Sequence, residues 1–391
     1  MPMAVEPVRF ETRREPRRVA LVHDYLVQDG GSERVLLALH ELYPRAPIFT
    51  LFHNPARTHI GFKHADIRPS YLNNLPFAKK RYQWYLPFMP DAVERFDLSN
   101  FDLVLSSSST FAKGVIAAPE GLHVCYCHTP TRFLWQERAG YVNELPQPRF
   151  VKRFIPPLLH LMRQWDAIAA RRPDVMLTNS QTSRLRIRRY YQRDAEVLAP
   201  PVDIDRIPFS TNPGSYWLTG GRLVAYKRFD LVVQAFAKLN VPLKIFGEGP
   251  ERDKLRKMAG PKTEFLGHVT DEAKIQLFRD AIAFLHPQIE DFGITAVEAM
   301  AAGRPIIAFG QGGAAETVLN GVTGTFFEVQ CWEDVGNAVL RFDPARFDPR
   351  QIRKHAETFG KPRFLEQMKQ RLDRAWSSHT SDISHLTSHI V

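Results

Sequence analysis

Short apolar segments, each followed by a loop and then by a helical pattern, recur along the whole chain. The first, Arg17–Leu26, precedes the loop Gln28–Gly31 and a helix expected over Ser32–Leu42, where leucine and valine recur at helical spacing. Such an alternation of buried strands and helices is typical of a mainly parallel sheet covered by helices. The pattern therefore predicts an α/β fold of doubly wound units.

The alternation occurs in two sets, which predicts two Rossmann-like domains facing a cleft. The further strands expected in the first half are Ile48–Phe52, Leu103–Ser106, His123–Cys127 and Val175–Asn179. The strands expected in the second half are Tyr216–Gly220, Leu243–Phe246, Thr263–Leu266, Ala283–His286 and Pro305–Phe309. The helices expected between these later strands are Phe229–Leu239, Glu251–Ala259, Asp271–Asp280 and Thr295–Ala302.

The expected domain boundaries follow changes in composition. A chain of 391 residues is long enough for two α/β domains, and residues 201–215, rich in proline and turn formers, are typical of a linker. The expected segments are a flexible arm at 1–16, a first Rossmann-like domain at 17–200, the linker at 201–215, a second Rossmann-like domain at 216–372 and a tail at 373–391. The tail, rich in serine and histidine, is expected either to fray or to cross back to the first domain.

Positive charge is concentrated in the first half of the chain. The formal net charge is +10, and the first 200 residues hold 28 Lys and Arg against 19 Asp and Glu, whereas the remainder hold 24 against 23. A basic domain beside a neutral one indicates an acidic partner for the first half, such as a phosphate-bearing substrate, an anionic membrane surface or nucleic acid. Charge alone leaves these alternatives open.

The three cysteines, Cys125, Cys127 and Cys331, are too few for a disulfide framework, so we expect a reducing, cytoplasmic location. No run of 18 apolar residues occurs and the first residues lack an apolar core, so we expect neither a membrane span nor an export signal. Two patterns resemble metal motifs, Cys125-Tyr126-Cys127-His128 and Asp203-Ile204-Asp205. The first lacks a second ligand cluster and the second lies in the linker, so we expect no metal and no other cofactor.

The stretch Glu290–Gly313, EDFGITAVEAMAAGRPIIAFGQGG, places two carboxylates around an expected helix start. Backbone N–H groups near Phe292-Gly293-Ile294 would form an anion site suited to a diphosphate, strengthened by the helix dipole. Glu298, one turn into the helix, would accept hydrogen bonds from the two hydroxyls of a ribose. Thr295 and Glu298 also fit a capping box, which needs no ligand, and both interpretations stay open. The layout suits a sugar nucleotide.

A second block, Gly220-Gly221-Arg222, follows an expected strand, and Lys227 comes five residues after the arginine. A fixed cation can neutralise the charge that develops on a departing diphosphate, in place of a metal ion. Solvated loop cations are the alternative. Gly247 and the loop at Val269 follow two further strands, where a flat base would approach the backbone, although a simple turn explains the glycine equally well.

These blocks resemble the signatures of retaining glycosyltransferases of the GT-B fold, family 4. Glu290 and Glu298 match the two glutamates of the E-x7-E signature, and LTGGRLVAYKRF is similar to the G-R-L-x4-K block. The resemblance implies that Arg222 and Lys227 grip the donor diphosphate, that Glu290 orients the sugar hydroxyls, and that the two further loops bind the base. Arg228 stands where many relatives have glycine, which leaves the shape of this loop open.

The first half adds candidates for donor and acceptor contacts. Gly30-Gly31-Ser32-Glu33 precedes a helix and matches the G-G-x-E turn of the family, whose N–H groups would face the donor phosphate. His128 follows the strand His123–Cys127, at the end where α/β proteins bind ligands, and the resemblance implies a contact with the donor sugar. A packed or solvated histidine is the alternative. Asp24, just before the glycine turn, is a weaker acceptor-side candidate.

Several segments of the first half resemble mannosyltransferases of bacterial exopolysaccharide assembly, of the xanthan/acetan type; they include VHDYLVQDGGSERVL, FDLVLSSSSTFAKGV and CYCHTPTRFLW. This resemblance implies transfer of mannose from GDP-mannose to a polyprenyl-diphosphate-linked cellobiose through an α-1,3 link. The second domain would bind the donor and the first would offer the acceptor. No convincing nucleophile for a covalent intermediate is apparent, so we favour attack by the acceptor on the face that the diphosphate leaves.

Two aromatic and basic segments, Leu75–Phe88 and Phe150–Trp165, suit an anionic membrane surface, which predicts peripheral association with the inner face of the cell membrane. Core-packed helices with solvated cations are the equal alternative. The arginine run from Arg184 to Arg193 is interpreted as a solvated helix face, so no nucleic acid is expected. Two other functions stay open: a sugar-nucleotide 2-epimerase, which would turn over the donor alone, and a basic nucleic-acid-binding protein, whose binding would weaken steeply with salt.

Overall fold

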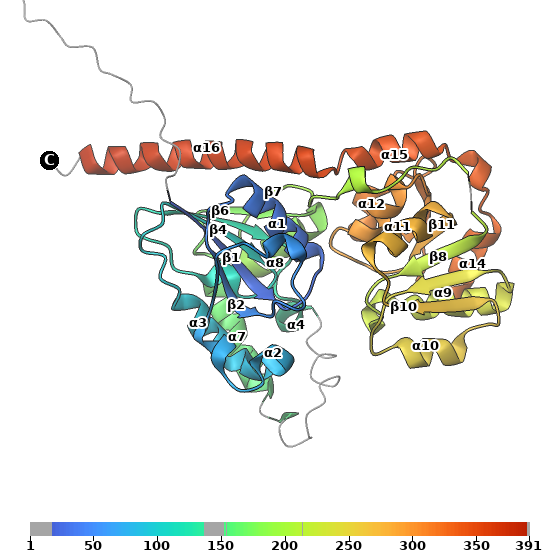
Figure 1. The fold of residues 1–391 in the computed structure, drawn as a ribbon, viewed down its shortest axis with the longest axis horizontal. Helices are drawn as coiled ribbons and strands as arrows, with labels where there is room; N and C mark the ends of the chain where they lie inside the picture. The colour runs from blue at the N-terminus through green and yellow to red at the C-terminus, as the bar shows by residue number, and fades with distance from the viewer. Residues whose placement is uncertain (1–17, 137–151, 154, 213, 389–391) are drawn as a thin grey trace, which may run out of the picture. The chain divides into compact units, whose positions relative to one another are not determined.

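The computed structural model describes residues 18–136, 152–153, 155–212 and 214–388, apart from the side chains at 79, 80 and 383–388. The chain divides into two compact units, Met1–Leu177 with Gln367–Val391, and Thr178–Glu366 (Figure 1). The division therefore lies earlier than the boundary expected near residue 200.

Helix α8 (Gln181–Tyr191) accounts for this difference. The carboxylate of Glu316 accepts the backbone N–H groups of Gln181 and Thr182, each at 2.7 Å, and so caps the start of the helix. Arg186, one turn further on, forms an ion pair with Asp291. Both partners belong to the second unit, so α8 belongs to that unit although it lies between two strands of the N-terminal sheet in the sequence.

The N-terminal sheet has the strand order β3-β2-β1-β4-β5-β6-β7. Its strands are β1 (Val19–Leu26), β2 (Ile48–His53), β3 (Ile67–Pro69), β4 (Leu103–Ser108), β5 (Leu122–Cys127), β6 (Val175–Thr178) and β7 (Glu196–Val197). The described pairings among β1 to β5 are all parallel, and β4 and β5 are buried throughout. Because the winding reverses between β1 and β4, the C-terminal ends of these two strands form a topological switch point.

Helices and 3-10 turns cover this sheet. The α-helices of the first unit are α1 (Gly31–Leu42), α2 (Ala78–Arg81), α3 (Met89–Glu94), α4 (Arg132–Trp135) and α7 (Ile155–Ala169), and the 3-10 turns are η1 (Ile60–Phe62), η2 (Tyr71–Asn74), η3 (Tyr82–Phe88) and η4 (Ala112–Gly114). The last helix, α16 (Lys361–Ser388), joins this unit from Gln367 onward. There Met368 and Leu372 are buried, and His379 Nε2 lies 3.0 Å from the carbonyl oxygen of Glu120.

The second unit has a six-stranded sheet in the order β10-β9-β8-β11-β12-β13, with all pairings parallel. Its strands are β8 (Tyr216–Gly220), β9 (Leu243–Phe246), β10 (Thr263–Gly267), β11 (Ala281–His286), β12 (Ile306–Phe309) and β13 (Gly324–Phe327). Its further helices are α9 (Phe229–Leu239), α10 (Arg252–Met258), α11 (Asp271–Arg279), α12 (Ile294–Ala301), α13 (Ala314–Thr317), α14 (Trp332–Leu340) and α15 (Pro349–Glu357), with 3-10 turns η5 (Ile204–Arg206), η6 (Ala225–Lys227) and η7 (Pro344–Arg346). The switch point of this sheet lies between β8 and β11.

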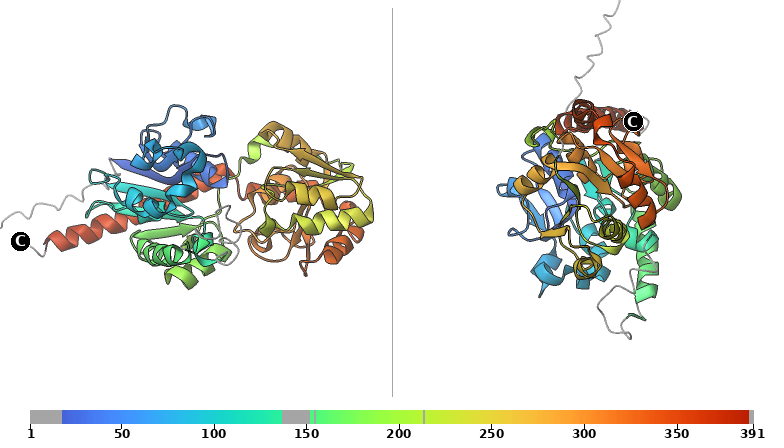
Figure 2. Two further views of the ribbon diagram at one scale, coloured as in Figure 1. Left: turned by 90° about the horizontal axis from the view of Figure 1, so that it is seen from below. Right: turned by 90° about the vertical axis from the view of Figure 1, so that its right-hand side faces the viewer.

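Two apolar clusters pack between the second sheet and its helices. The helices that cover this sheet are drawn as ribbons in Figure 2. One joins the sheet to α11, α12 and α15 through Phe278, Met300 and Ile352. The other joins it to α9 and α14 through Phe236 and Val335. The alanines of α12 are all buried, because this short helix packs closely on the sheet, and the tight packing fixes the start of α12 beside the end of β11.

The sequence predicts the central strands to within one or two residues at each end. Three strands are not predicted: β3 and β7, at the two edges of the first sheet, and β13, at one edge of the second, whereas the edge strand β10 is predicted. They are two to four residues long, and β3 is mostly exposed, so no apolar run marks them. The two α/β folds with parallel sheets are confirmed.

Candidate active site

The candidate donor residues gather at the switch point of the second unit. Gly220 ends β8 and is followed by Gly221, whereas His286 ends β11 and leads into the loop that carries Glu290. Parallel strands place their C-terminal ends at one edge of a sheet, and ligands of doubly wound proteins bind where the strand order reverses. Blocks that lie 70 residues apart in the sequence are therefore neighbours here.

Lys227 and Glu290 form an ion pair across this switch point. Lys227 Nζ lies 2.7 Å from Glu290 Oε1, and the two side chains are 14% and 16% exposed. The lysine ends the turn η6, after β8, and the glutamate follows β11. The two candidate residues are thus in direct contact, although neither sequence block alone indicates the pairing.

Arg222, the other expected diphosphate ligand, is exposed, and no ion pair involves it among residues that the structure describes. Gly221 adopts a φ of +134°, and a Cβ there would lie 3.3 Å from Lys227 Nζ. A glycine at this position therefore leaves space around the ammonium group. Arg228 has a φ of 54° and takes the left-handed conformation that glycine favours. The loop thus keeps the shape that the glycine of relatives would allow, and Arg228 pairs with Asp230 at 3.2 Å.

Gly293 begins α12 and has a φ of +87°, which disfavours any other residue. A Cβ added there would also lie 3.2 Å from His286 Nε2. Phe292 is buried and packs edge to face against Phe359, so its side chain belongs to the core, and Ile294 is half-buried against the same core. Any contribution of these three positions to anion binding would therefore come from the backbone.

Glu298 does not form the capping box that the sequence allowed. The N-cap of α12 is Gly293, no side chain caps the helix, and Thr295 lies within it. The carboxylate of Glu298 instead lies 3.0 Å from Lys274 Nζ of α11, which also faces Asp271 at 3.4 Å. Burial opposes the charge on Lys274, but the two carboxylates hold its pKa above the ordinary value. Lys274 is a site residue that the sequence did not indicate.

His286 is a second residue that the sequence analysis missed. It is fully buried at the end of β11, and its Nε2 lies 3.9 Å from Glu290 Oε2. The side-chain amide of Gln288 lies 3.0 Å from its Nδ1. Burial lowers the pKa of His286 to about 4, so the ring is neutral at pH 7. The available signal was its position, four residues before Glu290 at the C-terminal end of a strand.

The two loops expected to bind the base are held together by glycines. Gly247 has a φ of +109°, and a Cβ there would come within 1.9 Å of the carbonyl oxygen of Gly221. Its N–H donates to the carbonyl of Gly267 at 2.6 Å. Gly247 is thus required by the packing of neighbouring loops, and Val269 packs on the core at the start of α11. Contact of either residue with a base stays a prediction.

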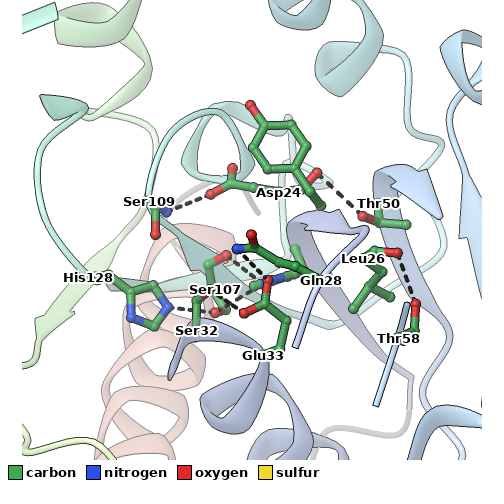
Figure 3. Close-up of polar contacts among 12 residues, drawn as sticks. Asp24, Leu26, Gln28, Ser32, Glu33, Thr50, Thr58, Ser107, Ser109 and His128 are labelled. Carbon is green, nitrogen blue, oxygen red and sulfur yellow. Dashed lines mark hydrogen bonds and ion pairs between the residues drawn. The ribbon is translucent and has the colours of Figure 1, made fainter. Parts of the chain in front are cut away.

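Asp24 lies at the switch point of the first unit and is 3% exposed. Its Oδ2 accepts the N–H group of Ser109 at 2.6 Å (Figure 3). The same oxygen accepts the N–H of Thr110, and Oδ1 accepts those of Phe111 and Ala112, at 2.7 to 2.9 Å. Four bonds occupy both oxygens. We therefore assign Asp24 the structural role of holding the loop after β4, in place of the expected acceptor-side role.

His128 belongs to a buried polar cluster at the same strand ends (Figure 3). Its Nε2 lies 2.9 Å from Ser107 Oγ, which lies 3.2 Å from His23 Nδ1, and His23 Nε2 is 3.8 Å from Glu33 Oε1. Burial lowers the pKa of His128 to about 4. Burial also opposes ionisation of Glu33, but its hydrogen bond with His23 holds the pKa of Glu33 below the ordinary value. The expected contact of His128 with a donor sugar stays a prediction.

The glycine turn before α1 faces this cluster. Gly30 is the N-cap of the helix, and a Cβ on it would lie 3.0 Å from Glu33 Oε2. The carboxylate of Glu33, which also accepts Ser32 Oγ at 2.9 Å, therefore already lies at the positive end of this helix. A phosphate contact through Gly30 and Gly31 stays a prediction.

The patterns considered for metal and nucleic acid have structural explanations. Cys125 and Cys127 are buried in β5, and Asp203 pairs with Lys361 at 3.6 Å. Within the described ranges no group of three or more His, Cys, Asp and Glu could hold a metal ion. In the arginine run, Arg184 and Arg188 pair with Asp194 at 2.8 and 3.5 Å. These charges are therefore engaged within the protein.

Each of the two segments considered for a membrane surface contains both exposed and buried apolar side chains. In the first, Phe77, Trp84 and Phe88 are 54% to 67% exposed, with the Arg81 guanidinium 4.5 Å from the Trp84 ring, whereas Tyr82 and Tyr85 pack on the core. In α7, Leu161 and Ile168 are exposed but Leu159 and Met162 are buried; the part of the second segment before residue 152 lies outside the described residues. Across the residues searched, the structure contains no helix of the length and apolarity that a membrane crossing requires.

Each of the two units has a parallel sheet whose central strands lead through a glycine loop into a helix, which is the architecture expected for the GT-B fold. The Glycosyltransferase Family 4 model matches residues 29–206, and the model of Glycosyl transferases group 1 matches residues 205–357. The chain therefore belongs to the group 1/family 4 type of GT-B glycosyltransferases.

Relatives and solved structures agree with this assignment. The chain is similar to an uncharacterized glycosyltransferase of Methanocaldococcus jannaschii, 34% identical over 27% of this chain and 29% of that protein. It is also similar to D-inositol 3-phosphate glycosyltransferase of Mycobacterium tuberculosis, 32% identical over 36% of this chain and 33% of that protein. The matched part thus spans about a third of these curated relatives.

Two solved structures share the fold over nearly the whole chain. HepE of Anabaena, in complex with UDP and glucose, has a TM-score of 0.68 at 19% identity and covers 91% of this chain and 99% of that one. Sucrose-phosphate synthase of Thermosynechococcus elongatus has a TM-score of 0.69 at 17% identity and covers 93% and 100%. At these identities the likeness shows the fold.

Proposed function

We propose that the second unit binds a sugar nucleotide and that the enzyme transfers its sugar with retention of configuration. The observation that carries this proposal is the Lys227–Glu290 ion pair at the switch point, 2.7 Å long and mostly buried. A diphosphate would draw Lys227 away from the glutamate and would also meet the exposed Arg222. The start of α12 at Gly293 would add backbone N–H groups and the positive end of the helix dipole.

In this proposal the two signature glutamates bind opposite ends of the donor. Glu290, released from Lys227, accepts hydrogen bonds from sugar hydroxyls, and Glu298, paired with Lys274, accepts them from the ribose. The bond between the anomeric carbon and the diphosphate breaks with its electron pair on the diphosphate, where Arg222 and Lys227 offset the charge. The acceptor oxygen then bonds to the same face of that carbon, and its proton passes to the leaving phosphate.

The finer assignment is GDP-mannose as donor and a polyprenyl-diphosphate-linked cellobiose as acceptor, joined through an α-1,3 link without a metal ion. It is supported by the likeness of the first half to exopolysaccharide mannosyltransferases and by the charge surplus of that half. The exposed rings of Phe77, Trp84 and Phe88 beside Arg81 suit a peripheral contact with anionic lipid, which such an acceptor requires. The UDP bound to the Anabaena structure supports a nucleotide donor in general.

The test is a transfer assay in membrane extract with radiolabelled GDP-mannose, with and without lipid-linked cellobiose. The wild type is compared with Glu290→Ala and with Glu251→Ala, a control that removes a glutamate paired with Lys254 at the surface of the same unit. We expect acceptor-dependent label in the lipid fraction, lost only in Glu290→Ala.

Three other outcomes separate the alternatives. Transfer from UDP-glucose or UDP-galactose alone would keep the mechanism and overturn the mannose assignment. Conversion of the donor without an acceptor would identify a 2-epimerase. Absence of turnover with every donor would overturn the proposed transferase site.

A further inference from the structure

His286 lies against the candidate donor site without being one of its signature residues. Its side chain is fully buried, and its Nε2 has no hydrogen-bond partner among the residues that the structure describes. Glu290 Oε2 lies 3.9 Å from this nitrogen, and a Cβ added to Gly293 would lie 3.2 Å from it. An unpaired polar atom in a buried place is costly unless a ligand or a conformational change provides a partner.

The surroundings of the ring determine which nitrogen carries the proton. The Gln288 amide nitrogen, a donor only, lies 3.0 Å from Nδ1, so Nδ1 accepts this hydrogen bond. Burial lowers the pKa of His286 to about 4, so the ring carries one proton at pH 7, and that proton is on Nε2. A neutral N–H donor therefore points toward the carboxylate of Glu290. If the proton were on Nδ1 instead, Nε2 would present its lone pair to that carboxylate.

The ion pair of Glu290 explains why such a donor is needed. Lys227 Nζ holds Oε1 at 2.7 Å, and the glutamate is 16% exposed. If Lys227 turns to a diphosphate, Glu290 loses this ion pair at a mostly buried position. A shift of about 1 Å would bring Oε2 within hydrogen-bond distance of His286 Nε2, because N–H···O bonds are about 2.9 Å long.

We propose that His286 is a positioning residue, which holds the carboxylate of Glu290 toward the sugar when the donor diphosphate takes Lys227 from it. The proposal rests on the donor site proposed above and deepens it. His286 acts through Glu290 and does not itself touch the donor. Its neutrality matters, because an imidazolium would compete for Glu290 as a second cation instead of orienting it through one hydrogen bond.

Two substitutions of His286 distinguish the role of its Nδ1 from that of its Nε2. In His286→Asn the side-chain oxygen can still accept the hydrogen bond from Gln288, but no donor reaches the place of Nε2. In His286→Gln the amide nitrogen occupies nearly the place of Nε2 and restores the donor. Both variants are purified as the full chain, checked by thermal unfolding, and assayed for kcat and KM with the sugar nucleotide and for binding of GDP by calorimetry.

We expect His286→Asn to lower kcat roughly tenfold to a hundredfold, as for loss of one hydrogen bond to a charged group. GDP lacks the sugar, so its Kd should stay within about twofold, and His286→Gln should recover most of kcat. Unchanged kcat in His286→Asn, or equal losses of kcat and GDP affinity in both variants, would overturn the positioning role. If the wild type binds GDP but turns over no donor, the proposed function fails and the inference fails with it.

A measurement on the wild type covers the case in which His286→Asn does not fold. The protein is labelled with ring-15N histidine, and the His286 signals are assigned by their loss in His286→Gln. On addition of GDP, the proton on Nε2 should shift downfield as it bonds to Glu290, and this shift should be absent in Glu290→Ala. No change in the wild type at saturating GDP would overturn the inference.

Discussion

Removing Lys227 and Glu290 singly and together separates the contribution of their ion pair to stability from its contribution to catalysis. At 2.7 Å and an effective dielectric constant of about 20, the attraction is about 6 kcal/mol, most of which offsets the cost of desolvating two groups. Lys227→Met removes this cation from Glu290, whose side chain is only 16% exposed. We therefore expect this variant to lose about 2 to 3 kcal/mol of the free energy of unfolding.

The partner substitution is expected to cost less. Glu290→Gln keeps an amide at the site, and the long side chain of Lys227 can turn its ammonium group to water, so we expect a loss of about 1 kcal/mol. The double variant lacks both charges of the pair and should be about as stable as Glu290→Gln alone, which corresponds to a coupling of about 2 to 3 kcal/mol. Urea unfolding of the four proteins measures this coupling. Additive losses would refute the reasoning, because they would mean that the two charges do not interact.

Activity should not follow stability in this series. A fixed cation at a departing anion contributes about 3 to 4 kcal/mol to the transition state, so Lys227→Met should lower kcat by roughly a hundredfold to a thousandfold. The double variant regains stability but still lacks the cation and the carboxylate, so its kcat should stay low. Recovery of kcat in the double variant would show that the pair is only structural.

Three further predictions concern other parts of the site. Asp24→Asn removes a charged acceptor from four backbone N–H groups and should cost about 2 to 3 kcal/mol of stability, measured as a lower urea midpoint; an unchanged midpoint would contradict the structural role. Thr295→Ala should change stability by less than about 0.5 kcal/mol, because Thr295 caps no helix, and a loss above about 1 kcal/mol would restore the capping box. His128 and His286 titrate near pH 4 when folded and near 6.5 when unfolded, so the unfolded chain binds more protons between these values. The free energy of unfolding should be highest above about pH 6.5 and should fall as the pH approaches 4, by roughly 3 kcal/mol for each histidine. The midpoint of urea unfolding should therefore be lower at pH 4.5 than at pH 7, and this difference should be smaller in His286→Gln.

The two signature glutamates share one structural feature. Each is paired with a lysine from a different element, Glu290 with Lys227 after β8 and Glu298 with Lys274 of α11. Each lysine thus places a positive charge beside a carboxylate that is mostly buried. The difference is that Lys227 also belongs to the expected diphosphate block, whereas Lys274 does not, which predicts an exchange of partners only at Glu290.

The central strands, the helices beside them and the switch-point loops could be predicted from the sequence, because continuous apolar runs and glycine loops are local signals. The edge strands β3 and β7 could not, because they are short, partly exposed and lack such runs. The sequence at Thr295 fits a capping box, but this local pattern is not realised. The N-cap of α12 is Gly293, so Thr295 lies within the helix. Asp24 is a similar case. Its residue type and its position at a strand end suggested a ligand contact, but backbone N–H groups of the loop after β4 donate hydrogen bonds to both of its carboxylate oxygens.

By itself the sequence determined which residue types stand at the ends of the strands, and through them the fold and the class of enzyme. The pairing of those residues was decided only by the tertiary structure. Lys227 meets Glu290, and His286 faces that same carboxylate, because the order of the sheet places β8 beside β11. Strand order depends on contacts between residues far apart in the chain, and such contacts leave no local periodicity or spacing from which the pairs could have been read.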